Sequence, residues 1–318
     1  MKVSAVIINH NGSEFLEKCV NSVLGQSLKP VEVMIIDSCS TDSSGDIIAK
    51  YGGLKVKILN NNIGFAAAAN MGIRETSGDY VLILNSDTCL KDDFLLKLSE
   101  AAEKLDNSYG MLSGKLLRMQ EESIVDSAGQ FIRRTLRPIE RNYGKDDKVY
   151  PSGQCFFPCG AVMLLKRKML ENVKFEEEYF DEDFFMYFED FDLGFRANAL
   201  GWKCCYESSA IAFHFRGGSD GKKGSKIFLF RKKSLELKRH LLANRYLVLT
   251  KNAPAGLIIR HLPYILIYEL FFWIYLLIFD IRVISGMKKF FKLRSRMKEK
   301  GKIVRIKIMK AEVKKWII

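Results

Sequence analysis

The chain of 318 residues is long enough for about two domains, and its 48% hydrophobic and 27% charged residues are close to the average of globular proteins. This composition excludes a disordered tail protein, a collagen and a pure coiled coil. The net charge of +13 is uneven, because residues 219–318 contain 25 Lys and Arg against 6 Asp and Glu, whereas residues 1–218 contain 25 against 31. We therefore predict a mildly acidic domain over 1–218 and a basic region over 219–318 that meets an anionic partner.

Seven cysteines are present without a Cys-x-x-Cys pair, so the usual spacings of zinc and thioredoxin motifs are absent. This favours free thiols in a reducing compartment. The N-terminus does not resemble a signal peptide, because the apolar run at 3–8 is short and is followed by Asn9, His10 and Asn11. We expect the catalytic part to remain in the cytoplasm.

The N-terminal part alternates short apolar runs rich in β-branched residues with segments of helical periodicity. Such alternation predicts an open α/β sheet in which ligands bind beyond the carboxyl ends of the strands. Asn9, Asp37 and Asp87 stand at such ends. The predicted strands are 3–8, 31–36, 55–59 and 80–84, and the predicted helices cover 15–24, a stretch through 47–48, and 64–74.

Two positions at this edge have competing interpretations when the residues are considered alone. Asp87 could hold a divalent cation, or it could be the N-cap of the helix that contains Phe94. Asn62 and Gly64 precede a helix whose N-terminus would favour an anion, although small residues there also allow close packing. A dinucleotide oxidoreductase is disfavoured, because the loop after the first strand has a single glycine, Gly12, in place of Gly-x-Gly-x-x-Gly.

The segment at 180–196 combines acidic and aromatic residues, which a purely solvated acidic face would not do. One interpretation is that Glu189, Asp190 and Asp192 favour the dipole at the start of a helix. The other is a carboxylate in a partly apolar pocket, with a pKa suited to proton abstraction. The neighbouring predicted strands are 162–165 before this segment, and 204–206 and 211–213 after it, ahead of His214.

The basic region contains an apolar run at 262–279 whose only charge is Glu269. A helix of this length is just short of the roughly 30 Å hydrocarbon thickness, and a central acid would cost about 2.5–3.5 kcal/mol at the bilayer centre. We therefore favour an interfacial or re-entrant membrane helix over a full span or a buried helix of a soluble domain. The basic tail after it would attract anionic lipid head groups, and no nucleic-acid-binding signature accompanies the charge.

Seven segments keep a recognisable order and spacing: VIINHNG (6–12), MIIDSCSTD (34–42), NNIGFAAAANMGI (61–73), YVLILNSD (80–87), CGAVML (159–164), FDEDFFMYFEDFDLGFRANALGW (180–202) and HFRGGS (214–219). In these segments, which extend over about two thirds of the chain, the sequence resembles the family 2 glycosyltransferases, and more narrowly their rhamnosyltransferase-like members. The resemblance implies a GT-A fold, with an open mixed α/β sheet flanked by helices and a Rossmann-like nucleotide-binding half. A basic, partly apolar helical region would follow it.

The resemblance also implies the transfer of a sugar, with inversion, from a nucleotide-diphosphate donor to a hydroxyl of a lipid-linked or surface glycan. Asp190 would be the general base, and Glu189 would help to hold it. Asp87 would hold a magnesium or manganese ion at the donor diphosphate, and His214 would be a second ligand of that ion or a contact of the diphosphate. The predicted donor-binding residues are Asn9, Asp37, Asn62, Gly64, Asn70, Asn85, Ser86 and Arg216, the last suggested only by the fit of arginine to phosphate, and the predicted acceptor-binding residues are Cys159 and Gly160.

One departure from the family concerns the metal, because Asn85-Ser86-Asp87 stands where many relatives have Asp-x-Asp. We expect a weakly held ion that arrives with the donor. Rhamnose from a thymidine diphosphate donor is suggested by the resemblance alone. We expect a role in cell-wall polysaccharide synthesis at the cytoplasmic face of the membrane.

Two alternatives belong to other functional classes. The chain could be a catalytically silent, nucleotide-sugar-binding membrane module of the same fold, although the retained Asp87, Asp190 and His214 argue against it. A nucleotidyltransferase is disfavoured, because the loop at 9–13 has no lysine or arginine for a triphosphate.

Overall fold

The computed structural model describes residues 1–148, 150–215, 230–310 and 312–318. Within them, a mixed ten-stranded sheet has the order β10-β12-β6-β11-β4-β1-β2-β3, with β5 paired to β12 and β7 to β6. Its strands are β1 (Val3–Asn9), β2 (Glu32–Asp37), β3 (Lys55–Ile58), β4 (Tyr80–Asn85), β5 (Thr88–Leu90), β6 (Tyr109–Arg118), β7 (Glu121–Ser127), β10 (Gly153–Cys155), β11 (Val162–Lys166) and β12 (Lys203–His214). A separate hairpin consists of β8 (Gln130–Ile132) and β9 (Pro138–Glu140).

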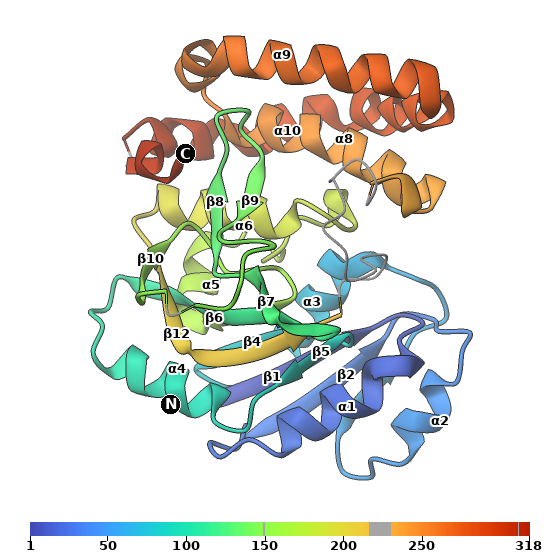
Figure 1. Cartoon of the computed structure of the whole chain (residues 1–318), viewed down its shortest axis with the longest axis vertical. Helices are drawn as coiled ribbons and strands as arrows, with labels where there is room; N and C mark the ends of the chain where they lie inside the picture. The colour runs from blue at the N-terminus through green and yellow to red at the C-terminus, as the bar shows by residue number, and fades with distance from the viewer. Residues whose placement is uncertain (149, 216–229, 311) are drawn as a thin grey trace.

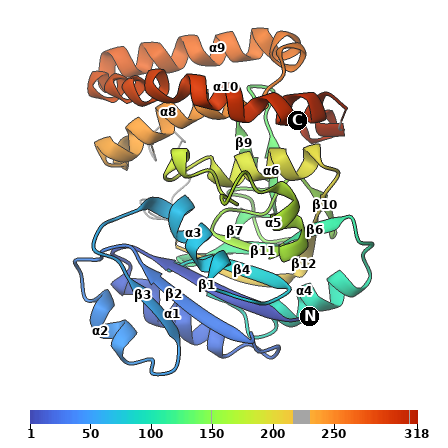
Figure 2. The ribbon, with the colours of Figure 1, turned by 180° about the vertical axis from the view of Figure 1, so that it is seen from behind.

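Helices cover both faces of the sheet, and the C-terminal helices form a further layer (Figure 1). The helices are α1 (Ser13–Leu24), α2 (Ser44–Ala49), α3 (Gly64–Arg74), α4 (Phe94–Glu103), α5 (Arg167–Val173), α6 (Glu189–Ala199), α8 (Leu235–Asn252), α9 (Ala255–Phe279) and α10 (Met287–Lys310). Short 3-10 helices lie at Glu182–Phe184, Ile281–Gly286 and Glu312–Trp316. One core lies between the sheet and α1, α2 and α4. The other includes residues of α3, α5 and α6, and it extends to α8 and α10, which lie above α6 in Figure 2.

The three central strands β1, β2 and β4 run parallel, so their carboxyl ends meet at one edge of the sheet. In register, Asn9 lies beside Asp37, and Ile8 lies beside Asn85. These strands are continuous apolar runs because helices cover both faces. The predicted α/β sheet with polar residues at one edge is confirmed.

The structure corrects two details of the sequence-based prediction. The two short strands expected at 204–206 and 211–213 belong to one long strand, β12, whose register against β6 shifts in between. This irregular stretch explains why the apolar pattern is interrupted there. Asp87 is not the N-cap of the following helix, because β5 begins at Thr88 and α4 begins only at Phe94.

Lysines of the C-terminal helices hold the acidic and aromatic segment. Lys251 of α8 is 1% exposed, and its Nζ lies 2.6 Å from an oxygen of Asp181 and 2.9 Å from one of Asp192. Lys300 of α10 adds a contact of 2.6 Å with Asp181. Burial would raise the pKa of Asp181, but the two lysines outweigh it and hold that pKa below its usual value. The stability that these pairs contribute is therefore complete above about pH 4 and declines as the pH falls through the lowered pKa.

These contacts join the C-terminal helices to the catalytic half through a shared core. The predicted domain boundary at residue 218 stays a prediction, and residue 218 lies outside the described residues. Asp192 also accepts a 3.0 Å hydrogen bond from Arg196 one helical turn later. Asp181 and Asp192 thus have a structural role, which is pairing with lysine and arginine side chains.

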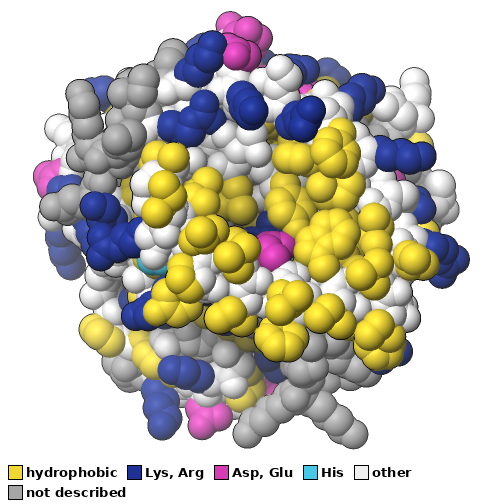
Figure 3. All heavy atoms as spheres, turned by 90° about the horizontal axis from the view of Figure 1, so that it is seen from above, with side chains coloured by type: hydrophobic (Ala, Val, Ile, Leu, Met, Phe, Trp, Pro, Cys, Tyr) yellow, Lys and Arg dark blue, Asp and Glu magenta, His cyan; other side chains and the backbone are white. Residues whose placement is uncertain are grey.

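Helix α9 is long and apolar, and most of it faces away from the protein. By length and composition it could cross a membrane, and only 6% of its most apolar 18-residue stretch is buried. Figure 3 shows a field of hydrophobic side chains on this upper face, with Lys and Arg around it. Glu269 is not an isolated charge, because Arg245 of α8 pairs with it and the Tyr246 hydroxyl donates to it. This exposure disagrees with a buried helix of a soluble domain.

Replacing Lys251 with Met tests how strongly the buried ion pairs hold the C-terminal helices. The substitution leaves Asp181 and Asp192 partly uncompensated, so we expect the free energy of unfolding to fall by about 3–5 kcal/mol. Replacing Lys50, which forms a 3.3 Å pair with Glu17 at the surface, should change it by less than about 1 kcal/mol. Urea unfolding followed by circular dichroism measures both values. Equally small effects would contradict a structural role for Lys251.

Candidate active site

Asn9 and Asp37 lie side by side where β1 and β2 end, and both are buried. The Asn9 Nδ2 donates a hydrogen bond of 2.7 Å to Asp37 Oδ2. Ser40 donates two more to the same carboxylate, from its backbone N at 2.9 Å and from its Oγ at 2.6 Å. These contacts hold the Asp37 carboxylate in one orientation, which suits an acceptor for donors on a nucleotide base.

Asp87 and His214 face each other, and Asp126 stands behind the histidine. The His214 Nε2 lies 3.6 Å from Asp87 Oδ2. On the other side of the ring, Nδ1 lies 2.8 Å from Asp126 Oδ2, which belongs to a fully buried residue of β7. Burial alone would lower the pKa of His214, but hydrogen bonds with Asp126 and Asp87 outweigh it and raise the pKa to about 9. The two carboxylates therefore stabilise the protonated, positively charged form of His214.

Asp87, together with His214 once its Nε2 has released a proton, fits a divalent cation whose other ligands come from outside the protein. Asp87 Oδ1 is buried and has no hydrogen-bond partner among the residues that the structure describes, and His214 Nε2 points toward the same carboxylate. A carboxylate suits magnesium or manganese, and the bond to Asp126 orients the imidazole as in many metal sites. Elsewhere in the described ranges, as here, no group of three or more His, Cys, Asp or Glu could hold a metal ion. A diphosphate and water would complete the coordination, as the single carboxylate in the sequence led us to expect.

Asp190 is the second residue of α6 and lies beside Gln130 and Gly160. The Gln130 Nε2 donates to Asp190 Oδ2 at 2.8 Å, and the Phe191 backbone N donates to Oδ1 at 2.7 Å. A Cβ on Gly160 would lie 2.7 Å from Oδ2, so a larger residue there would displace the carboxylate. Burial raises the pKa of Asp190, and the bonds from Gln130 and Phe191 partly offset this rise. A carboxylate in such surroundings suits a general base.

The adjacent Glu189 has a different environment. Its side chain is buried, and its Oε2 has no hydrogen-bond partner in the described ranges. Burial and the neighbouring charge of Asp190 raise the pKa of Glu189 well above its usual value. Of the two carboxyl groups, Asp190 is therefore the one that ionises more readily. The supporting role of Glu189 stays a prediction.

Short contacts connect Asp190 with Asp87. Gly160 packs against the Asp190 carboxylate, and the carbonyl of the next residue, Ala161, accepts a 3.0 Å hydrogen bond from the Asn85 backbone N. Asn85 stands two positions before Asp87. The side chains predicted to provide the base and the metal ligands therefore lie at the same edge of the sheet.

The backbone before Asp190 has an unusual conformation that Asn244 of α8 holds. Within residues 184–188, three aromatic residues have φ between 66° and 74°, a region that non-glycine residues rarely adopt. The Nδ2 of Asn244 lies 2.8–2.9 Å from three backbone carbonyl oxygens of this segment. The segment also packs on Gly64, where a Cβ would lie 2.5 Å from the ring of Phe185. The C-terminal helices thus help to position the segment that leads to Asp190, the predicted base.

Two predicted donor-binding residues on the α3 side also have roles inside the protein. The Asn62 Oδ1 accepts a 2.9 Å hydrogen bond from the Gly64 backbone N, which shapes the turn before α3. Asn70 is fully buried, and its amide makes hydrogen bonds with residues 179–182 through both its oxygen and its nitrogen. These bonds give Asn70 a structural role, and its contact with the donor stays a prediction.

The remaining predicted residues that the structure describes are Asn85, Ser86 and Cys159. Asn85 is the last residue of β4, and Ser86 follows it beside Gly12, where a Cβ would lie 2.4 Å from the Ser86 Oγ. Cys159 is buried in the core on the α1 side of the sheet, and its contact with an acceptor stays a prediction. Arg216 lies outside the described residues.

Sequence reasoning missed Asp126 and Gln130, which come from β7 and β8. Both lie in a stretch without a recognisable motif, and their partners are 88 and 60 positions away in the chain. One signal was available for Asp126, because it follows two apolar residues, Ile124 and Val125, and a charged residue in a buried strand needs a partner.

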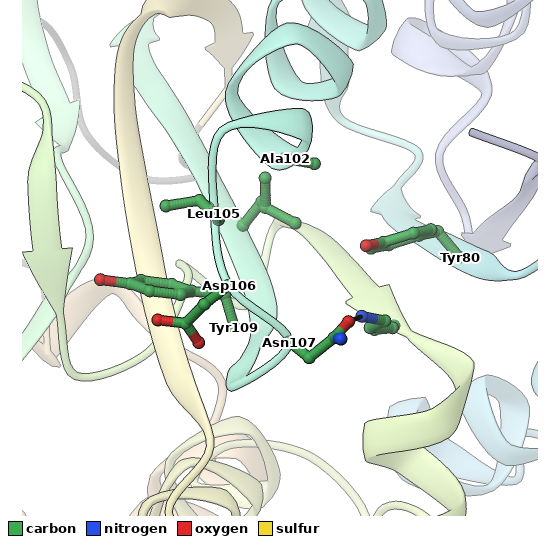
Figure 4. A pocket seen from close by; sticks show the side chains of 8 residues that line it. Tyr80, Ala102, Leu105, Asp106, Asn107 and Tyr109 are labelled. Atoms are coloured by element: carbon green, nitrogen blue, oxygen red, sulfur yellow. Dashed lines mark hydrogen bonds between the residues drawn. The ribbon is translucent and has the colours of Figure 1, made fainter.

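A pocket of about 200 Å³ lies elsewhere, as Figure 4 shows. It is lined by Tyr80 at the start of β4, Tyr109 at the start of β6 and Lys166 at the end of β11. These positions belong to the edge of the sheet opposite Asp87. The pocket is therefore separate from the site described above.

Residues 4–174, more than half of the chain, match the family model described as glycosyl transferase family 2. The chain belongs to this family. It is 28% identical over 233 residues to the succinoglycan biosynthesis protein ExoO of Rhizobium meliloti, a match that covers 68% of the chain and 62% of ExoO. It is 26% identical over 242 residues to an N-acetylglucosaminyl-diphospho-decaprenol L-rhamnosyltransferase of Mycobacterium tuberculosis, with 68% of the chain and 77% of that protein covered. The chain thus spans less than two thirds of the length of ExoO.

Among solved structures, the chain is similar to GalNAc-T7 with UDP, GalNAc and Mn²⁺, with a TM-score of 0.55 and 15% identity. The match covers 79% of the chain and 50% of that structure. At this identity the likeness shows the fold alone, and it confirms the predicted GT-A architecture. Together with the family match, this likeness shows that the chain contains a domain of the glycosyl transferase family 2.

Replacing Gly160 with Ala tests whether the position of Asp190 matters for sugar transfer. The new Cβ would displace the Asp190 carboxylate, and a shift of about 1 Å can lower kcat on the order of a hundredfold. The matched control is Gly153→Ala, because a Cβ there meets no atom within 4 Å. Steady-state transfer rates and thermal unfolding midpoints would be measured for both. Equal transfer rates in the two variants would show that the close approach of Gly160 does not position a catalytic group.

Proposed function

We propose that the chain transfers a sugar from a nucleotide-diphosphate donor to a hydroxyl of a lipid-linked or surface glycan, in a single inverting displacement. The observation that supports this most directly is that Asp190 and the Asp87–His214 pair lie at one edge of the sheet and are connected by short contacts. Asp190 is suited to accept a proton, and the Asp87–His214 pair is suited to stabilise the negative charge of a leaving diphosphate.

In this mechanism Asp190 accepts the proton of the acceptor hydroxyl as its oxygen attacks the anomeric carbon. Gln130 and Gly160 hold the carboxylate, so little reorganisation is needed when the hydroxyl arrives. A single displacement needs no covalent nucleophile, and none of the cysteines has to act as one. The inversion of the anomeric centre is part of the proposal.

A divalent cation held by Asp87 and His214 would supply the positive charge that stabilises the departing diphosphate. Asp126 fixes the His214 ring so that Nε2 faces this position. Asp37, oriented by Asn9, would contact the base of the nucleotide. Rhamnose is a candidate for the sugar, because a relative of the chain is named as an L-rhamnosyltransferase.

The acceptor and the location follow from the exposed face of α9. That helix lies along α8 and is tied to it by the pair of Glu269 and Arg245, so it would lie in the plane of a bilayer surface rather than across it. The surrounding lysines and arginines would meet anionic head groups at the cytoplasmic face. The relative that acts on a diphospho-decaprenol by its name suggests the lipid-linked class of acceptor.

Replacing Asp190 with Asn removes the proton acceptor while it keeps the size of the side chain. We expect kcat to fall by on the order of 10²- to 10⁴-fold, with little change in the affinity for the nucleotide donor. The transfer rate of the wild type should rise with pH at the acidic end of its profile, because Asp190 must be ionised to act as the base. Burial raises the pKa of Asp190, so this rise should lie above the usual pKa of an aspartate. Transfer assays and donor titration calorimetry measure these effects. Wild-type turnover in the Asn variant would exclude Asp190 as the base.

The exposed face of α9 can be tested with two substitutions that leave the core intact. Leu270 and Phe271 are 60% and 67% exposed, so replacing both with Gln should release the protein from anionic phospholipid vesicles in a flotation assay. The matched control replaces Val31 and Ile58, which are 56% and 62% exposed in the N-terminal half, with Gln. The control should still float with the vesicles. Equal flotation of both variants would contradict membrane contact through α9.

A further inference from the structure

The hairpin of β8 and β9 connects the candidate active site with the C-terminal helices. Its first residue, Gln130, donates the hydrogen bond to Asp190. Figure 1 shows the hairpin rising from the region of the sheet toward α9. At its turn, residues 133–137, Arg134 Nη1 donates to the hydroxyl of Tyr264 in α9 at 2.6 Å. One short element therefore reaches from the predicted base to the exposed apolar face.

Arginines gather where this turn meets α8 and α9. The guanidinium carbons of Arg137 and Arg245 lie 4.5 Å and 4.9 Å from the centroid of the same ring, that of Tyr268. Burial lowers the pKa of Arg137, and the neighbouring charges of Arg245 and Arg133 act in the same direction. The like charges are therefore close enough to repel one another.

Positive charge in this group exceeds the negative charge that the described residues provide. Glu269 pairs with Arg245, whereas Arg133 and Arg137 form no ion pair with any residue that the structure describes. The Nη1 of Arg245 is buried and has no hydrogen-bond partner within the described part of the chain. A buried guanidinium nitrogen without an acceptor is costly, and the planar forks of arginine suit phosphate oxygens. The group thus favours an anion with several oxygen atoms.

We propose that the arginine cluster, defined as Arg133, Arg134, Arg137 and Arg245, binds the diphosphate of the lipid-linked acceptor. This inference rests on the proposed function, in which a hydroxyl of that acceptor reaches Asp190. The turn begins three residues after Gln130, which is roughly 10 Å along a strand. That span is comparable to one sugar joined to a diphosphate. The sugar would lie at Asp190, the diphosphate at the arginines and the lipid chain along the outer face of α9.

The position of the cluster distinguishes it from a site for the donor. The donor diphosphate belongs at Asp87 and His214, at the edge of the sheet, whereas the cluster lies at the far end of the hairpin beside α9. Tyr264 and Leu266 of that helix are 43% and 58% exposed. An anion site that adjoins exposed apolar side chains suits a head group attached to a hydrocarbon chain.

Vesicle binding separates this proposal from a general attraction to anionic lipids. The probes are phosphatidylcholine vesicles that contain either a polyprenyl diphosphate or phosphatidylglycerol at matched surface charge. The test variant is R133Q/R137Q, and the matched control is K288Q/K292Q, which removes two exposed charges of α10. We expect the wild type and the control to prefer the diphosphate vesicles. The test variant should lose this preference, with an affinity for diphosphate vesicles lower by about tenfold or more.

The outcomes that would overturn the proposal are equal losses on both kinds of vesicle, unchanged binding by the test variant, or no preference in the wild type. If R133Q/R137Q shows a lowered thermal unfolding midpoint, R134Q repeats the test at an exposed side chain. The assay needs no turnover, so it is separate from the test of the proposed function. A diphosphate preference without sugar transfer would contradict the function alone, and transfer to lipid-linked acceptors with unchanged binding by R133Q/R137Q would contradict the arginine site alone.

Discussion

The hydrogen bond from Gln130 to Asp190, together with the close approach of Gly160, fixes one carboxylate at the edge where the parallel strands end. The sheet by itself provides only half of a catalytic site, namely Asn9, Asp37 and the residues that follow β4. The proposed base, Asp190, comes from α6 and is held against this edge by β8 and by the turn before β11. A displacement at the anomeric carbon needs groups on opposite sides of that carbon, and this packing brings them together.

The C-terminal helices contribute to the packing around Asp190, and they also form the exposed apolar face of the protein. Asn244 of α8 hydrogen-bonds the backbone that leads to the base, while the next residue, Arg245, pairs with Glu269 of the exposed helix. Lys251 and Lys300 neutralise acids of the segment that contains Asp190. The basic residues of the C-terminal helices thus have two different roles. Some charges are buried partners of carboxylates, and others are exposed around an apolar face.

Much of the fold and part of the site could be predicted from the sequence, because both depend on local patterns. Apolar runs closed by Asn9, Asp37 and Asp87 indicated parallel strands and their common edge, and motif order indicated the family. Asp126 and Gln130 could not be found in this way, since their roles depend on contacts with residues 88 and 60 positions away. The same holds for Glu269, whose charge looked isolated in sequence and has a partner only in the folded chain.

The claim that a cation and a base act on opposite sides of one bound donor is tested most directly by anomalous scattering from Mn²⁺ in crystals grown with thymidine diphosphate. A peak within bonding distance of the Asp87 carboxylate and the His214 Nε2, with the diphosphate on it and Asp190 facing the open side, is the expected result. A nucleotide bound at this edge with no manganese beside Asp87, or a diphosphate that lies against Asp190, would contradict it.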